Sequence, residues 1–285
     1  MKHPAFARLA RAVLAVVLIF VVWHAVILVF GLKPYVMPPP QAAIGVIVSQ
    51  WGHLRALAWQ TLVETADGYV LGAAIGFILG ILMGQMRLVR EVLYPILITS
   101  QAVPIVAIAA PLVIIFGFGL LPKLIIVAWI VFFPVVVSVL DGLAHVDADL
   151  ANLARMMGAK PWRAFLVVRL PATISPLFSG LKIGATYAVT GAVIGEWTAS
   201  SSVGLGTYLL SANARLNTAG VYGAMLLLTV IGVGSFLLVQ GVELLLTPWR
   251  SRSTAPRWLR RRRAVAPAPA ERLGSPKPDL HGGMR

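Results

Sequence analysis

The stretch VDADLANLARMMGAKPWRAFLVVRLPA, residues 146–172, is the longest polar interruption between two strongly apolar runs of the chain. The pattern predicts a helix, a turn and a second helix. Asp147 or Asp149 can cap the first helix with its carboxylate. Gly158 can end that helix, because glycine adopts the left-handed backbone conformation without strain. Pro161 suits the first turn of the second helix, where a missing N–H group is tolerated.

This helix pair is amphipathic, which allows two interpretations. Leu150, Leu153, Ala154 and Met157 recur at helical spacing, and Pro171 closes the unit just before the next apolar run. Such a pair on a membrane protein can dock into a groove of a soluble partner. Alternatively, it is a solvated loop that lies on the lipid headgroups.

The composition is that of an integral membrane protein. Of the 285 residues, 59% are hydrophobic and only 12% are charged, whereas a soluble domain carries about twice that charged fraction. The sequence contains no cysteine, which excludes disulfides and thiolate metal sites. Its five histidines are scattered and form no HExxH motif, so no metal site is predicted. Without a GxxxxGK[ST] motif or a GxSxG elbow, the chain is expected neither to bind ATP nor to be an enzyme.

The predicted fold is all-α, with six transmembrane helices. About 20 apolar residues cross the ~30 Å hydrocarbon core of a bilayer. The competing interpretation of the first run is a cleaved signal peptide, but it is too long and no small-residue cleavage site follows it. The predicted spans are residues 12–31, 66–86, 92–118, 123–143, 173–197 and 220–246.

Three segments outside these spans have their own character. KPYVMPPP, residues 33–40, is a stiff extended linker because proline lacks the donor that a helix needs. Residues 41–62 suit an interfacial helix, with tryptophans at headgroup level. Residues 249–285 are basic and of low complexity, and we expect them to be disordered and to contact anionic lipid rather than nucleic acid. The predicted organisation is an N-terminal helix and linker (1–40), a core (41–248) and a basic tail (249–285).

A row of glycines marks the second span. In a membrane, small residues on one face let another helix approach closely, and we favour this packing role over a ligand site. The row consists of Gly68, Gly72, Gly76, Gly80 and Gly84.

Polar groups near the spans are candidates for a substrate path. Ser100 and Gln101 are predicted to lie in the middle of the third span, beside Pro104, where they need partners. They either line a pathway or bond to other helices. Glu196 ends the fifth span, where it could bind a substrate or act in a gate, or be a structural acid. Asn213 lies in the polar segment after it.

Charge asymmetry predicts the orientation of the chain. With six spans both termini lie on one side, which then carries 19 Lys and Arg against 4 on the other. Basic residues accumulate on the cytoplasmic side. The termini and the 146–172 loop are therefore expected in the cytoplasm.

The 146–172 loop resembles the EAA loop of ABC importer permeases. Ala154, Gly158, Leu170 and Pro171 match that motif, while Asn152 replaces its usual Glu, Leu153 its first Ala and Val168 its Ile. The resemblance implies a coupling helix that seats in an ATP-hydrolysing subunit, although the missing Glu weakens any expectation of a salt bridge there. The residues assigned to coupling are Asp149, Asn152, Ala154, Gly158, Ala159, Pro161, Leu170 and Pro171.

The resemblance extends over roughly residues 41–248. GYVLGAAIGFILGILMG (68–84) is similar to permeases of the nitrate, sulfonate and taurine branch. SQAVPIVAIAAPLVIIFGFGLLPK (100–123) and VIGEWTASSSVGLGTYLLSANARLNT (193–218) look closer to permeases for pyrimidine precursors of thiamine.

This resemblance implies a multi-pass permease of the bacterial inner membrane that works as a homodimer. A periplasmic or lipid-anchored binding protein would deliver the solute. ATP and Mg would bind separate ATPase subunits, with no cofactor on this chain. The expected substrate is a thiamine-pyrimidine precursor, and the alternatives are a sulfonate, taurine or nitrate. A secondary carrier or a non-transporting scaffold are the alternatives of another class. A carrier needs acids in the middle of its spans, and none is predicted there.

Overall fold

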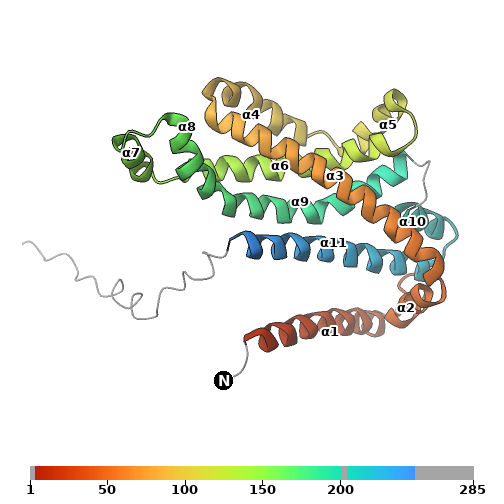
Figure 1. Ribbon diagram of the computed structural model, residues 1–285. Helices are drawn as coiled ribbons and strands as arrows, with labels where there is room; N and C mark the ends of the chain where they lie inside the picture. The colour runs from red at the N-terminus through yellow and green to blue at the C-terminus, as the bar shows by residue number, and fades with distance from the viewer. Residues whose placement is uncertain (1–3, 200–203, 248–285) are drawn as a thin grey trace, which may run out of the picture. The chain divides into compact units, whose positions relative to one another are not determined.

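All the regular secondary structure is helical in the part of the chain described by a computed structural model, residues 4–199 and 204–247. The all-α prediction is confirmed there (Figure 1). The first helices are α1 (Pro4–Phe30), α2 (Pro40–Ser49), α3 (Trp51–Gln85), α4 (Arg87–Gln101), α5 (Ile105–Phe116) and α6 (Leu120–Ala144). After them come α7 (Ala148–Met156), α8 (Pro161–Ala164), a π-helical turn (Phe165–Arg169), α9 (Leu170–Thr198), α10 (Leu205–Ala214) and α11 (Thr218–Leu246).

The chain divides into two compact units, residues 1–242 and 243–285. Of the second unit, only residues 243–247 are described. The predicted tail, 249–285, therefore lies outside the described residues. Everything below concerns the first unit.

Five of the described stretches are long and apolar enough to cross a membrane, and a sixth is counted if α4 and α5 form one span. The five are α1, α3, α6, α11 and the continuous stretch from α8 through α9.

The core of the first unit is built from α3, α6 and α9, which pack side by side (Figure 1). A row of valines on α6, from Val127 to Val139, is fully buried together with Ala188 and Ala192 of α9. Tyr69 and Phe77 of α3 pack against this group. In α6, every fourth residue thus forms a ridge that its two neighbours enclose.

Glycines on both neighbours allow this close packing. The predicted row on α3 faces α6, and a Cβ atom on Gly72 would lie 2.7 Å from the backbone oxygen of Ala128. A second row, which sequence analysis missed, lies on α9 and faces α6 from the other side. There a Cβ atom on Gly191 would lie 3.0 Å from Val127 Cα. Small residues thus bring the backbones together, as is typical of membrane helices. The second row consists of Gly180, Gly184, Gly191 and Gly195.

The predicted third span, 92–118, is not a single helix. The chain breaks at residues 102–104, and α4 and α5 are bent by 100° to each other. Pro104 precedes α5, and proline disfavours helical geometry in the residue before it. Ser100 and Gln101 consequently lie at the break rather than inside a straight helix.

Two further boundaries differ from the prediction. Residues 51–62 do not form a separate interfacial helix with 41–50, because they are the first part of the 35-residue helix α3. The tryptophans that suggested a surface position, Trp51 and Trp59, are exposed on this part of α3. In addition, residues 205–214, which belong to the polar segment after the fifth predicted span, form the helix α10.

Pro171 does not close the loop as predicted. Residues 161–198 run on without a turn, and Pro171 lies in the first turn of α9. The preceding π-helical turn accommodates it, with the Leu170 N–H group bonding to the Phe165 oxygen five residues back. Such a bulge relieves the clash and missing hydrogen bond that proline brings to a regular helix.

Candidate functional site

Two groups of residues are candidates for function, and they lie at opposite ends of the central helices α6 and α9 (Figure 1). The first is the 146–172 loop, which connects the end of α6 to the start of α9. The second, called the polar cluster below, consists of Thr61, Glu64, Lys123, Glu196 and the first turn of α10 (204–207).

The ends of α7 are fixed by local hydrogen bonds. Asp147 precedes the helix, and its Oδ1 accepts the N–H group of Asp149 at 2.8 Å, which makes Asp147 rather than Asp149 the cap. At the other end Gly158 has a φ of +78°. The Ala159 N–H group donates to the Ala154 oxygen at 3.1 Å, as in a glycine-terminated helix. The sequence therefore dictates where this short helix starts and stops.

The loop exposes several large apolar side chains. Met156 and Met157 are 86% and 80% exposed, and the guanidinium of Arg163 lies over the Trp162 ring at 5.2 Å from its centroid. Methionine is adaptable and common at binding surfaces. The exposed apolar side chains of the loop are Leu150, Leu153, Met156, Met157, Trp162, Leu166 and Val167.

The residues assigned to coupling occupy two parts of this region. Asp149, Asn152 and Gly158 are exposed on or directly after α7, while Ala154 and Ala159 are half-buried. Pro161 begins α8 as expected for its missing N–H group. Leu170 and Pro171, by contrast, lie beyond the π-helical turn, in α9.

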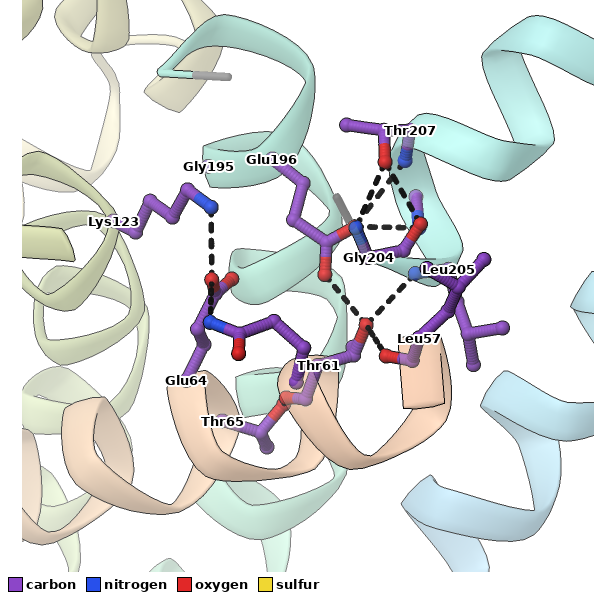
Figure 2. Close-up of polar contacts among 12 residues, drawn as sticks. Leu57, Thr61, Glu64, Thr65, Lys123, Gly195, Glu196, Gly204, Leu205 and Thr207 are labelled. Atoms are coloured by element: carbon purple, nitrogen blue, oxygen red, sulfur yellow. Dashed lines mark hydrogen bonds and ion pairs between the residues drawn. The ribbon is translucent and has the colours of Figure 1, made fainter. Parts of the chain in front are cut away.

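At the opposite end, Glu196 is fully buried near the end of α9. Its carboxylate accepts hydrogen bonds from the Thr61 hydroxyl at 2.6 Å and from the backbone N–H groups of Gly206 at 2.6 Å and Thr207 at 3.2 Å (Figure 2). Those two N–H groups belong to the first turn of α10. A carboxylate from α9 therefore caps α10 at the positive end of its dipole.

Thr61 joins α3 to the same arrangement. Its hydroxyl accepts the Leu205 N–H group at 2.9 Å and donates to Glu196 (Figure 2). Gly206 permits this approach, because a Cβ atom there would lie 2.8 Å from the carboxylate. Three helices, α3, α9 and α10, thus meet at one carboxylate.

One turn further along α3, Glu64 pairs with Lys123 of α6. Lys123 Nζ lies 2.8 Å from Glu64 Oε1, and both side chains are fully buried. The same oxygen accepts a hydrogen bond from the amide of Gln60 at 2.9 Å. These partners explain why a polar stretch of α3 can be buried.

Sequence analysis missed this pair because the predicted second and fourth spans begin at residues 66 and 123. Glu64 was therefore placed outside its span and Lys123 at the edge of its own. The signal was present in the spacing. Glu64 precedes Gly68 by four residues and so continues the glycine row of α3, and Lys123 precedes Val127 by four and so continues the valine ridge of α6. Two rows that face each other along their length place their charged ends together.

The predicted substrate-path residues fall into separate places. Ser100 and Gln101 are neighbours at the α4–α5 break, and Ser100 lines a hollow with Thr99 and Val103. Glu196 belongs to the polar cluster, and Asn213 is exposed near the C-terminal end of α10. Within the described residues these positions do not converge on one site. No group of three or more described residues is arranged to hold a metal ion.

Comparison with known proteins places this architecture. Residues 72–252 match the family described as "Binding-protein-dependent transport system inner membrane component". A probable ABC transporter permease of Haemophilus influenzae is 36% identical over 79% of this chain and 92% of its own length. A formylaminopyrimidine transport permease of Halalkalibacterium halodurans is 28% identical over 82% and 94% of the two chains. A riboflavin transport permease of Chloroflexus aurantiacus is 30% identical over 82% and 88%.

Proposed function

Since the chain belongs to the family of inner-membrane components of binding-protein-dependent ABC transporters, we propose that it moves a thiamine-pyrimidine precursor into the cell as one half of a homodimer. It is a multi-pass permease of the inner membrane, and its ATPase is a separate subunit. A substrate-binding protein is the other partner that this kind of transport implies.

The observation that carries the coupling role is the apolar surface of α7 and its surroundings. A helix defined by an Asp cap and a left-handed glycine presents Met156 and Met157 to the surroundings. An exposed apolar helix face of this kind fits a groove on a soluble protein better than a freely solvated loop. We assign that groove to the ATPase subunit. Nucleotide-driven closure would then move the loop, and the spans behind it, between inward-open and outward-open states.

The orientation proposed from the basic residues agrees with this role. It places both termini and the 146–172 loop in the cytoplasm, where ATP is, and the polar cluster at the periplasmic end. The basic residues near the membrane surface also favour contact with anionic lipid.

The substrate class is supported by the residues and by two relatives. Formylaminopyrimidine and riboflavin, named for two of the relatives, are both nitrogen heterocycles. The described part of the spans presents no arginine at mid-depth for a sulfonate or nitrate. Relatives named for aliphatic sulfonate and taurine transport are each 30% identical to this chain, so these solutes and nitrate are the second candidates. A secondary carrier or a scaffold without transport activity is set aside for this family.

A variant pair tests the coupling. In proteoliposomes with the ATPase and the binding protein, Met156→Asp should lower stimulated ATP hydrolysis and uptake at least about tenfold, because a carboxylate would be buried in an apolar contact. Met86→Asp is the matched control, since Met86 is exposed between α3 and α4 and aspartate suits the start of a helix. Equal activity of both variants would show that Met156 of the loop does not contact the ATPase subunit.

The substrate is tested in the same proteoliposomes. Uptake of a formylaminopyrimidine or hydroxymethylpyrimidine is expected to require ATP and the binding protein. Uptake of taurine, an alkanesulfonate or nitrate instead would keep the permease and overturn the pyrimidine assignment.

A further inference from the structure

A cavity of about 310 Å³ lies where α10 meets the start of α3, two helices that contact each other (Figure 1). It is separate from the carboxylate of Glu196, which caps the other end of α10. Its volume falls at the lower end of the range of small-molecule sites, about 300–1,000 Å³. The residues that define its chemistry are Gln50, His53, Tyr208, Arg215 and Asn217.

Hydrogen bonds inside the protein fix the orientation of two amide side chains at this cavity. The Tyr208 hydroxyl donates to Gln50 Oε1 at 3.1 Å, and burial raises the pKa of Tyr208, so that it keeps its proton. Asn217 Oδ1 accepts the Gly220 N–H group at 3.0 Å, at the start of α11. With their oxygens engaged in this way, both amides have their NH₂ groups left to donate.

Arg215 adds a positive charge and further donors. Its guanidinium carries five N–H groups and no acceptor. Among the described residues that line the cavity, none is acidic. The lining therefore favours a ligand that is rich in hydrogen-bond acceptors.

The turn that positions Arg215 and Asn217 is strained. Leu216, between them, has a φ of +55°, which is unfavourable by about 1–2 kcal/mol for a residue other than glycine. The backbone holds this geometry through the Asn217 N–H group, which donates to the Ala212 oxygen at 2.9 Å. Strain of this kind gathers at functional sites, where it sets the direction of neighbouring side chains.

Two aromatic rings border the cavity, and either of them can stack on a planar ligand. The rings of His53 and Tyr208 lie 6.2 Å apart, inclined by 59°, and the buried side chains of Leu57 and Ala212 add apolar lining. An aromatic ligand can stack on such rings while its edge meets the amides and the guanidinium. A compact anion such as nitrate would use Arg215 and leave the rings without a role.

We propose that this cavity is a binding site of the permease for its solute, and that it takes a planar heteroaromatic molecule bearing hydrogen-bond acceptors. The inference rests on the proposed function, which makes such a molecule the cargo. The solute would occupy the cavity after leaving the binding protein and before entering the spans.

Two nearly isosteric substitutions test the site. Gln50→Glu retains the oxygen that accepts from Tyr208, and Asn217→Asp retains the helix cap, but each replaces a donor by an acceptor. Arg215→Met, at an exposed position, removes the cation without disturbing a buried group. Gln41→Glu is the matched control, because Gln41 is exposed on α2 and does not line the cavity.

The measurement is binding of a labelled formylaminopyrimidine to the full-length permease assembled with its ATPase in lipid nanodiscs, without binding protein. We expect saturable binding that each of the three cavity variants weakens at least about tenfold, since each variant loses a hydrogen-bond donor to the ligand, and two of them put an acceptor in its place. The Gln41→Glu variant should bind like the parent. Equal thermal-unfolding midpoints would show that the four variants are folded.

The outcomes separate this inference from the function it rests on. The complete transporter could take up the pyrimidine although all variants bind it equally, or although no binding to the permease is detected. Either result would overturn the cavity assignment and leave the proposed cargo unchanged. If no pyrimidine is taken up or bound, the cargo assignment fails, and a planar heteroaromatic ligand for the cavity fails with it.

Discussion

At the scale of single residues, Glu196 links α9 to both other helices of its surroundings, α3 and α10. One oxygen of its carboxylate serves two N–H groups of α10, and the other serves Thr61. These contacts explain how an acid at the end of a span can be fully buried. They describe an acid that attaches α10 to the central helices.

This structural role predicts a difference between two substitutions. Glu196→Ala should lower the free energy of unfolding by more than about 2 kcal/mol, because it leaves buried N–H groups of α10 without an acceptor. Glu196→Gln should cost less than about 1.5 kcal/mol. Its oxygen can still accept from α10, and its NH₂ group can donate to Thr61, whose hydroxyl can turn to the Leu57 oxygen 3.1 Å away.

Denaturation of the purified variants in detergent measures both effects. Glu91→Ala, which removes an exposed acid paired with Arg87, is the control and should change stability by about 0.5 kcal/mol or less. Equal losses of stability in the Ala and Gln variants would contradict the cap. If Gln preserves stability but abolishes uptake, the charge itself has a role in transport.

At the scale of elements, the approach of α3 to α6 depends on glycine. Gly72→Ala should destabilise the protein by about 1–3 kcal/mol, because the added methyl would meet the backbone of Ala128. Gly52→Ala is the matched control on the same helix. Nothing lies within 4 Å of a Cβ atom there, so the better helix propensity of alanine should leave stability equal or up to about 1 kcal/mol higher. Indistinguishable melting of the two variants would refute close packing at Gly72.

The same elements show what the sequence could predict. The period-four glycine row indicated a close helix contact, but not which helix makes it, because every apolar span is a possible partner in lipid. The break at residues 102–104 was not predicted, because proline is tolerated within a span and composition cannot distinguish a kink from a 100° bend. Glu64 and Lys123 were misplaced because their cost of burial falls only when both are present.

The 146–172 loop was the most predictable part, because its signals are local. An Asp cap, a left-handed glycine and a proline at a helix start each act within a few residues. The attachment of α10 was the least predictable, since it depends on Thr61 and Glu196, which are 135 residues apart.

At the scale of the whole molecule, the orientation of the chain determines whether the two candidate regions can do what is proposed for them. The 146–172 loop must face the ATPase and the cavity beside α10 must face the binding protein. The charge asymmetry of 19 against 4 basic residues predicts this arrangement. The absence of cysteine makes the prediction simple to test, because any introduced cysteine is the only thiol in the chain.

Two exposed positions serve for this test, Lys160 in the loop and Asn213 on α10. In spheroplasts, a membrane-impermeant maleimide should label the Asn213→Cys variant and leave Lys160→Cys unlabelled. After the membrane is permeabilised, Lys160→Cys should be labelled as well, most strongly without the ATPase subunit that is proposed to cover the loop. The cysteine-free parent gives the background. Labelling of Lys160→Cys in intact spheroplasts would show that the loop faces the periplasm. That orientation would rule out both the coupling role of α7 and solute entry beside α10.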